Sequence, residues 1–252
     1  MLKFAANLSL LWAELPYLDR FAAAANAGFE AVEILFPYDL AASRTQRALI
    51  ANGLELILMN GPPPNYTGGA RGFAAVPGGE ERFKYDMRRA FRYVDVLKPK
   101  FLHVMAGEAE GGSAKDTMIR NLKWATEAAP KGLTLTVEPL NPKAMPGYFL
   151  NDYAQAADIL DAVGAPNVGL QYDSYHAQMI HGDAVAIFEA YKRRIAHVQI
   201  GDTPDRGPPG SGEVDFVTLF ASIAASNYKG WISAEYLPGT RTEETLDWMN
   251  IR

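Results

Sequence analysis

The stretch LTLTVEPLN, residues 133–141, combines a strand-forming run with an acid at its end. Its β-branched and apolar residues are typical of a buried strand. The run ends in the carboxylate Glu138, which Pro139 follows at once. Because burying an unpaired carboxylate is costly, Glu138 is either an incidental strand end or part of a site that meets a ligand.

The same kind of strand recurs along the chain, at residues 3–9, 31–36, 54–60, 101–107, 133–139, 167–173, 197–202 and 231–236. Stretches with helical spacing lie between them, at residues 17–28, 45–53, 81–97, 116–129, 152–164, 184–194 and 215–227. Several of these end in a residue that tolerates a left-handed cap, namely Gly28, Gly53, Gly164 and Asn227. About eight alternating strand–helix units predict an α/β fold, a (β/α)₈ TIM barrel.

The rival fold, a doubly wound sheet, would carry a Gly-rich turn after its first strand. That strand ends instead in ANLSLLW, residues 6–12. No break in composition divides the chain, so we expect a single domain over residues 1–252. The Gly/Pro-rich stretch at residues 60–79 interrupts the pattern after the third strand, where a barrel carries an active-site loop or lid.

Composition narrows the class of protein. The net charge of -5 and pI near 5.4 argue against a nucleic-acid partner. The absence of cysteine excludes disulfides, thiolate metal sites and a cysteine nucleophile, and it fits a reducing compartment. Polar residues interrupt the apolar N-terminus too early for a signal sequence, so a cytoplasmic location is expected. No apolar run reaches the length of a membrane span.

The carboxyl ends of the last four predicted strands carry polar side chains: Glu138, Asp173, Gln199 with Asp202, and Glu235. In a barrel these strand ends converge on one face, so the side chains become neighbours. Clustered carboxylates repel one another unless a cation lies among them. An all-oxygen set suits Mg²⁺ or Mn²⁺ better than zinc. For any single residue, the alternative is a solvated strand end or a helix cap.

The four histidines are predicted to differ in their roles. His176 follows Asp173 by three residues and is placed either to reach a substrate oxygen or to bond the backbone. His197 and Gln199 are predicted to point to the same inward face of their strand. His197 either supports the metal site or is a core histidine whose hydrogen bonds are satisfied within the protein. His103 is predicted to point inward as well, with its role open, and His181 to begin a surface helix.

Two arginines lie in Gly/Pro-rich loops. Arg71 and Arg206 are either solvated or placed to hold a small anionic substrate. The segments GGSAK, residues 111–115, and GSGE, residues 210–213, lack the spacing of phosphate-binding loops, so we discount them.

Seven motifs together resemble the hydroxypyruvate isomerase family, with its 2-oxo-tetronate isomerase relatives, among the xylose isomerase-like TIM barrels. They are NLSLLWAE, VEILFPYD, GARGFAAVPG, VEPLN, QYDSYHAQ, HVQIGDTPDRGPPGSGEVDF and GWISAEYLP. The resemblance covers essentially the whole chain. It implies that Glu138 and Glu235 are the catalytic proton donor/acceptor pair, and that a divalent metal is bound by Glu138, Asp173, Gln199 and Glu235.

The resemblance also bears on the reaction. Gln199 stands where related ketose epimerases usually have His, which counts against an epimerase. The implied activity is the isomerisation of hydroxypyruvate to 2-hydroxy-3-oxopropanoate, with 2-oxo-tetronate isomerisation as the alternative and a non-catalytic sugar-acid binding protein as the non-enzyme alternative. Mg²⁺ is expected without an organic cofactor, and Arg71, Arg206, His176 and His103 are expected to bind substrate. The sequence leaves the oligomer open, with a homo-oligomer as one expectation.

Overall fold

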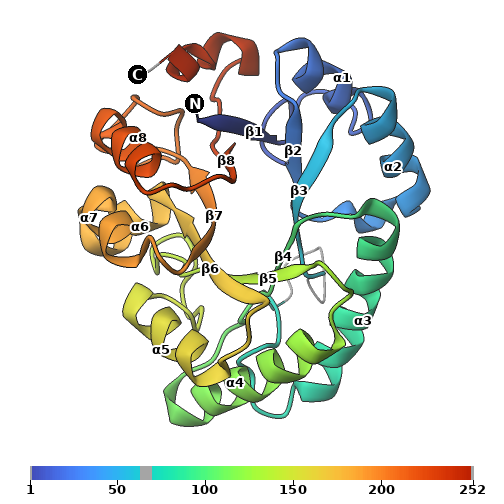
Figure 1. Cartoon of the computed structure of the whole chain (residues 1–252), viewed down its shortest axis with the longest axis vertical. Helices are drawn as coiled ribbons and strands as arrows, with labels where there is room; N and C mark the ends of the chain where they lie inside the picture. Colours follow the sequence, from blue (N-terminus) through green and yellow to red (C-terminus); the bar gives the residue numbers. More distant parts are fainter. Residues whose placement is uncertain (1, 63–69, 251–252) are drawn as a thin grey trace.

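The eight predicted strands close into a parallel barrel in chain order (Figure 1). The computed structural model describes residues 2–62 and 70–250. The strands are β1 Lys3–Asn7, β2 Ala31–Ile34, β3 Glu55–Asn60, β4 Phe101–His103, β5 Thr134–Val137, β6 Val168–Asp173, β7 Ile195–Ile200 and β8 Trp231–Ala234. This single-domain architecture confirms the predicted TIM barrel.

Helices form the outer ring around the strands in Figure 1. They are α1 Asp19–Asn26, α2 Ala42–Ala51, α3 Glu80–Leu97, α4 Gly111–Ala128, α5 Tyr153–Val163, α6 Ser174–His181, α7 Ala184–Tyr191 and α8 Phe216–Ala225. In the described part of the chain there are also three short 3₁₀ helices, η1 Pro37–Asp39, η2 Thr242–Thr245 and η3 Asp247–Asn250. Within the described residues, the longest helices are too polar to cross a bilayer.

Local sequence explains where these helices start and stop. The Asp152 side chain accepts the backbone N–H groups of Ala154 and Gln155, which caps the first turn of α5. The same helix ends at Gly164, whose φ of 66° is left-handed and costs little without a Cβ. Asn227 has a φ of 62° just beyond α8. The predicted closing residues therefore do end helices.

One helix was missed. The segment Ser174–His181 forms α6 directly after β6, because the Asp173 side chain accepts the Tyr175 N–H and begins the helix at the strand end. The prediction that His181 begins a helix is wrong, since it is the last residue of α6. His181 is partly exposed, and its Nε2 lies 3.6 Å from Asp152 Oδ2. The extra helix carries His176, which is buried and lines the cavity described below.

The barrel interior changes from apolar to polar along its axis. Ala5, Ala31 and Ile57 form a small apolar cluster with Phe101 and Trp231 packed against it. Further along the strands the inward side chains are polar and buried; they include Asn7, Glu33, Asn60, His103, Thr136, Gln171, Asp173, His197, Gln199 and Ser233. A polar interior must satisfy its own hydrogen bonds, so this half of the barrel is the place to look for a site.

Candidate active site at the carboxyl end of the barrel

The strand ends of β5 to β8 bring four predicted side chains together. Glu138 and Glu235 follow β5 and β8 directly, Asp173 ends β6, and Gln199 lies near the end of β7. All four are buried. The topology of the barrel therefore gathers residues that the sequence separates by up to about a hundred positions.

Arg206 reaches from the β7–α8 loop into this acid cluster, defined as Glu138, Asp173 and Glu235. Its Nη2 donates to Asp173 Oδ2 at 2.9 Å and to Glu235 Oε1 at 2.8 Å. The guanidinium also lies over the Tyr175 ring, 5.2 Å from its centroid. Burial lowers the pKa of Arg206, but the carboxylates of Glu235 and Asp173 outweigh this effect and raise it, so the side chain stays charged. One cation thus already neutralises part of the cluster.

The pKa values of both glutamates are raised in this site. Burial raises the pKa of the Glu138 carboxyl well above its usual value, and Glu235 and Asp173 raise it further. Burial also raises the pKa of Glu235, to about 8, although the charge of Arg206 opposes this rise. A carboxyl group whose pKa is raised above its usual value takes up a proton closer to neutral pH, as a general acid or base requires.

The donor set fits a divalent cation. Glu138 Oε1 and Glu235 Oε2 are buried, and neither has a hydrogen-bond partner among residues 2–62 and 70–250. Ligand atoms of Glu138, Asp173 and His176 lie within 4.8 Å of one another, so this group could hold a metal ion. Unpartnered buried carboxylate oxygens are costly, and a hard cation satisfies them through oxygen ligands.

His176 presents an N–H to the same space. The backbone N–H of Asn141 donates to its Nδ1 at 3.0 Å, so the proton of the neutral ring is on Nε2. Burial lowers the pKa of His176, and Arg206 lowers it further, which keeps the ring neutral. Its Nε2 lies 3.9 Å from Asp173 Oδ2. In this tautomer Nε2 is a hydrogen-bond donor, which suits a ligand oxygen better than a metal.

A cavity of about 260 Å³ opens onto these groups. The predicted substrate residues Arg71, His103, His176 and Arg206 all line it, together with Asn60, Glu138 and Glu235. Arg71 is exposed at its rim. The part of the predicted lid at residues 63–69 lies outside the described residues. The loop beyond it pairs with the segment after β4, through an antiparallel bridge between Gly72 and Ala106.

The wall formed by β3 and β4 is polar but neutral. Burial lowers the pKa of His103 to about 3, and His197 adds to this effect, so the ring is uncharged. Both His103 ring nitrogens and Asn60 Oδ1 are buried without a hydrogen-bond partner in the described part of the chain. Such groups are expected to meet a ligand or water. Asn60 was not predicted, although it ends an apolar strand as Glu138 does.

A network of buried side chains supports the acid cluster from below. Gln171 Nε2 donates to both Glu138 Oε2, at 3.0 Å, and Gln199 Oε1, at 2.7 Å. Gln199 Nε2 donates in turn to Glu33 Oε2 at 2.8 Å, and His197 Nε2 contacts Glu33 Oε1. His197 thus reaches Gln199 only through Glu33, and its supporting role at a metal site stays a prediction. The sequence signal for Glu33, an acid inside an apolar strand, was overlooked.

The prediction that Asp202 faces the acid cluster is wrong. Its carboxylate turns into the β7–α8 loop and accepts backbone N–H groups from Thr203, Gly210, Gly212 and Val214 at 2.8 to 3.0 Å. It holds the loop that carries Arg206. The GSGE segment is thus a structural turn around Asp202.

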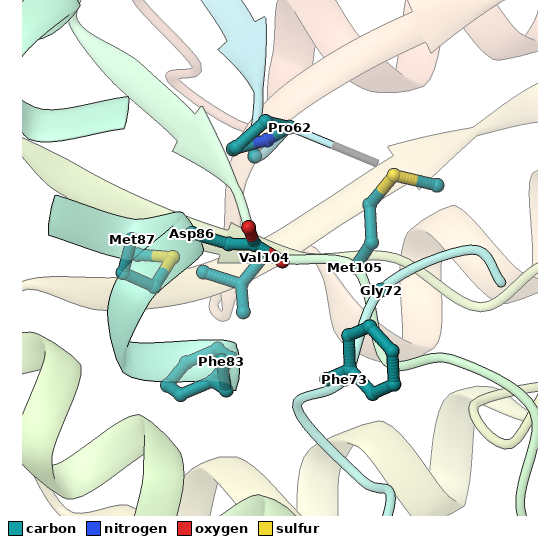
Figure 2. Close-up of a pocket in the computed structure, with 9 residues that line it drawn as sticks. Pro62, Gly72, Phe73, Phe83, Asp86, Met87, Val104 and Met105 are labelled. Atoms are coloured by element: carbon teal, nitrogen blue, oxygen red, sulfur yellow. The ribbon is translucent and has the colours of Figure 1, made fainter. Parts of the chain in front are cut away.

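A smaller cavity of about 20 Å³ lies beside the long loop after β3 (Figure 2). Phe73, Phe83, Asp86, Met87 and Val104 are among the residues that line it. Asp86 accepts from Arg82 Nε at 3.0 and 3.1 Å. This space, about the size of one water, is a packing gap rather than a ligand site.

Comparison with known proteins agrees with this geometry. The family model described as xylose isomerase-like TIM barrel matches residues 21–252. The 2-oxo-tetronate isomerase of Cupriavidus necator is 41% identical, over 99% of this chain and 98% of that protein. The hydroxypyruvate isomerase of Escherichia coli is 38% identical, over 99% of each.

A solved structure is also similar. The crystal structure titled AP endonuclease, family 2, from Brucella melitensis has a TM-score of 0.95 and 40% identity, over 99% of this chain and 98% of that one. The full-length similarity to two proteins named as isomerases says more about the function than the shared fold does. The chain therefore belongs to the xylose isomerase-like TIM barrel family and is an isomerase related to the hydroxypyruvate and 2-oxo-tetronate isomerases.

Proposed function

We propose that the protein interconverts hydroxypyruvate and 2-hydroxy-3-oxopropanoate by proton transfer between Glu138 and Glu235. The observation that carries this proposal is a pair of buried glutamates that line one cavity, each with an unpartnered oxygen among the described residues. The raised pKa of both carboxyls suits general acid–base work near neutral pH. The named isomerase relatives support the reaction class.

The chain's residues divide the work between them. One glutamate removes a proton from C3 of the substrate and the other delivers a proton to C2, while the proton of the C3 hydroxyl passes to the C2 oxygen, so that the carbonyl moves from C2 to C3. Arg206, bound to both Asp173 and Glu235, holds positive charge beside the developing enediolate. The Nε2–H of His176 donates to a substrate hydroxyl or carbonyl oxygen. Arg71 holds the substrate carboxylate at the cavity rim.

Glu138, Asp173, Gln199 and Glu235 would hold a divalent ion, Mg²⁺ or Mn²⁺, as an all-oxygen set. When bound, such an ion polarises the substrate carbonyl and stabilises negative charge on its oxygen. No organic cofactor is needed for this chemistry. We propose a cytoplasmic location on the cysteine-free composition.

The direct test is a proton-exchange assay in D₂O with purified protein and Mg²⁺ or Mn²⁺. We expect deuterium to appear at C3 of hydroxypyruvate and the aldehyde product to form, both followed by proton NMR. The same assay is run with four-carbon 2-oxo acids. A protein that exchanges no proton in any of these acids would refute the proposal.

Arg71→Ala is expected to raise KM for the substrate by about tenfold or more, the cost of losing a charge-assisted hydrogen bond. The Arg71 side chain is exposed, so the melting temperature should change little. Steady-state kinetics and thermal unfolding measure the two effects. An unchanged KM would mean that Arg71 is only solvated and would make Arg206 the carboxylate-binding residue.

A second candidate substrate is a four-carbon 2-oxo-tetronate, and two observations favour it. The neutral wall of Asn60 and His103 has unpartnered polar atoms within the described chain, which suit an additional hydroxyl. The Cupriavidus necator relative bears that name.

Asn60→Leu should then lower kcat/KM for the four-carbon acid by about 10–100-fold, the cost of one lost hydrogen bond to a buried polar group. Its effect on hydroxypyruvate should be smaller. Equal losses on both substrates would contradict this role for Asn60.

Other classes fit the site less well. A DNA-repair endonuclease of this fold would need a His-rich multinuclear zinc site and a basic face. Here the cluster is acidic, and the net charge is -5. A non-catalytic sugar-acid binding protein would have no use for two glutamates with raised pKa values in one cavity.

A further inference from the structure

The buried acid Glu33 lies beneath the proposed metal site without facing its cavity. It comes from β2, and its carboxylate reaches β7 on the far side of β1 and β8. The side chain is fully buried. A carboxylate in such a place needs a function that outweighs its cost of burial.

Three side-chain N–H groups converge on Glu33. Asn7 Nδ2 lies 3.2 Å from Oε2, Gln199 Nε2 lies 2.8 Å from the same oxygen, and His197 Nε2 contacts Oε1. All three neighbours can donate, so Glu33 is the acceptor for each of them. Asn7 and His197 thereby hold the carboxylate in place for Gln199.

The hydrogen bonds run in one direction from β5 to β2. Thr136 Oγ1 donates to Gln171 Oε1 at 2.8 Å. Gln171 Nε2 donates to Gln199 Oε1 at 2.7 Å, and Gln199 Nε2 donates to Glu33. The chain ends on a carboxylate, which can only accept. A flipped Gln199 amide would place its oxygen against that carboxylate, so Glu33 excludes the flipped orientation.

The orientation of Gln199 decides whether it can serve as a metal ligand. Its oxygen and Glu138 Oε2 both accept from the Gln171 amide nitrogen, at 2.7 and 3.0 Å, so one NH₂ group bridges the two oxygens. An amide oxygen has two acceptor positions, and only one is used by Gln171. The NH₂ end has no lone pair for a cation, so a flipped amide would not bind one.

We propose that Glu33 is a positioning residue, which holds the amide of Gln199 with its oxygen toward Glu138 and thereby completes the oxygen set for a divalent cation. The inference rests on the metal site of the proposed function. It concerns only this chain's own residues, and it explains why an acid and a histidine lie buried where no substrate reaches.

The first test is Glu33→Asp, which keeps the charge but withdraws the carboxylate by one methylene. We expect about 10–100-fold weaker Mn²⁺ binding to the purified protein, the usual cost of losing an outer partner of a metal ligand. Titration calorimetry measures the Kd, and the melting temperature of the chelated protein monitors folding. Glu55→Asp on β3, whose partners are Lys100 and Trp231 at the surface, is the matched control and should bind Mn²⁺ as wild type does.

A reciprocal exchange provides the second test. Gln199→Glu places two carboxylates against each other and should also weaken Mn²⁺ binding. Adding Glu33→Gln restores the hydrogen bond in the reverse direction, because the amide at position 33 now donates to the carboxylate at position 199. That carboxylate offers an oxygen to a cation in either orientation. The double variant should recover at least about tenfold of the affinity lost by Gln199→Glu alone. A merely structural role for Glu33 would not give this recovery.

The outcomes separate the two hypotheses. Wild-type-like Mn²⁺ binding by Glu33→Asp, or a double variant no better than Gln199→Glu, would overturn the positioning role alone. A wild-type protein that binds no Mn²⁺ would overturn the metal site and the positioning role with it. If Glu33→Asp fails to fold, the exchange variants, which keep the side-chain lengths, decide the question.

Discussion

Glu138→Gln and Glu235→Gln are each expected to lower kcat by at least about 10²-fold, the lower end of general acid–base contributions. The substitution keeps the size of the side chain and one oxygen for coordination, but the amide cannot take up and return a proton. Both carboxyls line the same cavity and have raised pKa values. Single-turnover and steady-state kinetics with hydroxypyruvate and the four-carbon acids measure the loss.

The double variant Glu138→Gln with Glu235→Gln should fall little below either single variant. Two groups that act in one proton transfer are not additive, because removing either of them already stops the transfer. Metal content has to be measured alongside, since a lost ion would mimic a lost base. A metal-loaded single variant that isomerises near the wild-type rate would show that the two-glutamate mechanism is wrong for this protein.

Chelation is expected to abolish activity and to lower the melting temperature, with the larger stability loss at higher pH. The carboxyl pKa of Glu235 rises from its usual 4.5 to about 8 in the fold, and that of Glu138 rises as well. Between these pH values the folded chain binds more protons than the unfolded chain, so stability without metal falls as pH rises through this window. A bound cation replaces those protons and stabilises the folded state.

Thermal unfolding with and without a chelator, from about pH 5 to pH 8, measures this difference. The gap between the two melting temperatures should widen with pH. Re-addition of Mg²⁺ or Mn²⁺ should restore activity. Full activity in a rigorously demetallated protein would contradict the metal dependence, and a pH-independent gap would mean that the glutamates do not share the ion.

Sequence patterns alone predicted the barrel because strand and helix periodicities are local. The runs at residues 133–139 and 167–173 each contain a strand, β5 and β6. An acid at or directly after the end of each strand, Glu138 and Asp173, lies at the carboxyl end of the barrel. The strand-end rule then brought Glu138, Asp173 and Gln199 together without any knowledge of distance. The predicted strand at residues 101–107 was too long, since β4 ends at His103 and the chain there leaves the ladder to line the cavity.

Only the tertiary structure decided which polar groups meet across the barrel. Asp202 and Arg206 lie in one loop, yet the first binds the loop backbone and the second enters the acid cluster. Glu33 follows the same sequence pattern as Glu138 but lies below the site, because its depth in the barrel depends on strand register rather than on residue type. Sequence periodicity determines which face a side chain occupies, whereas side-chain partners depend on loop paths and register that packing of the whole chain sets.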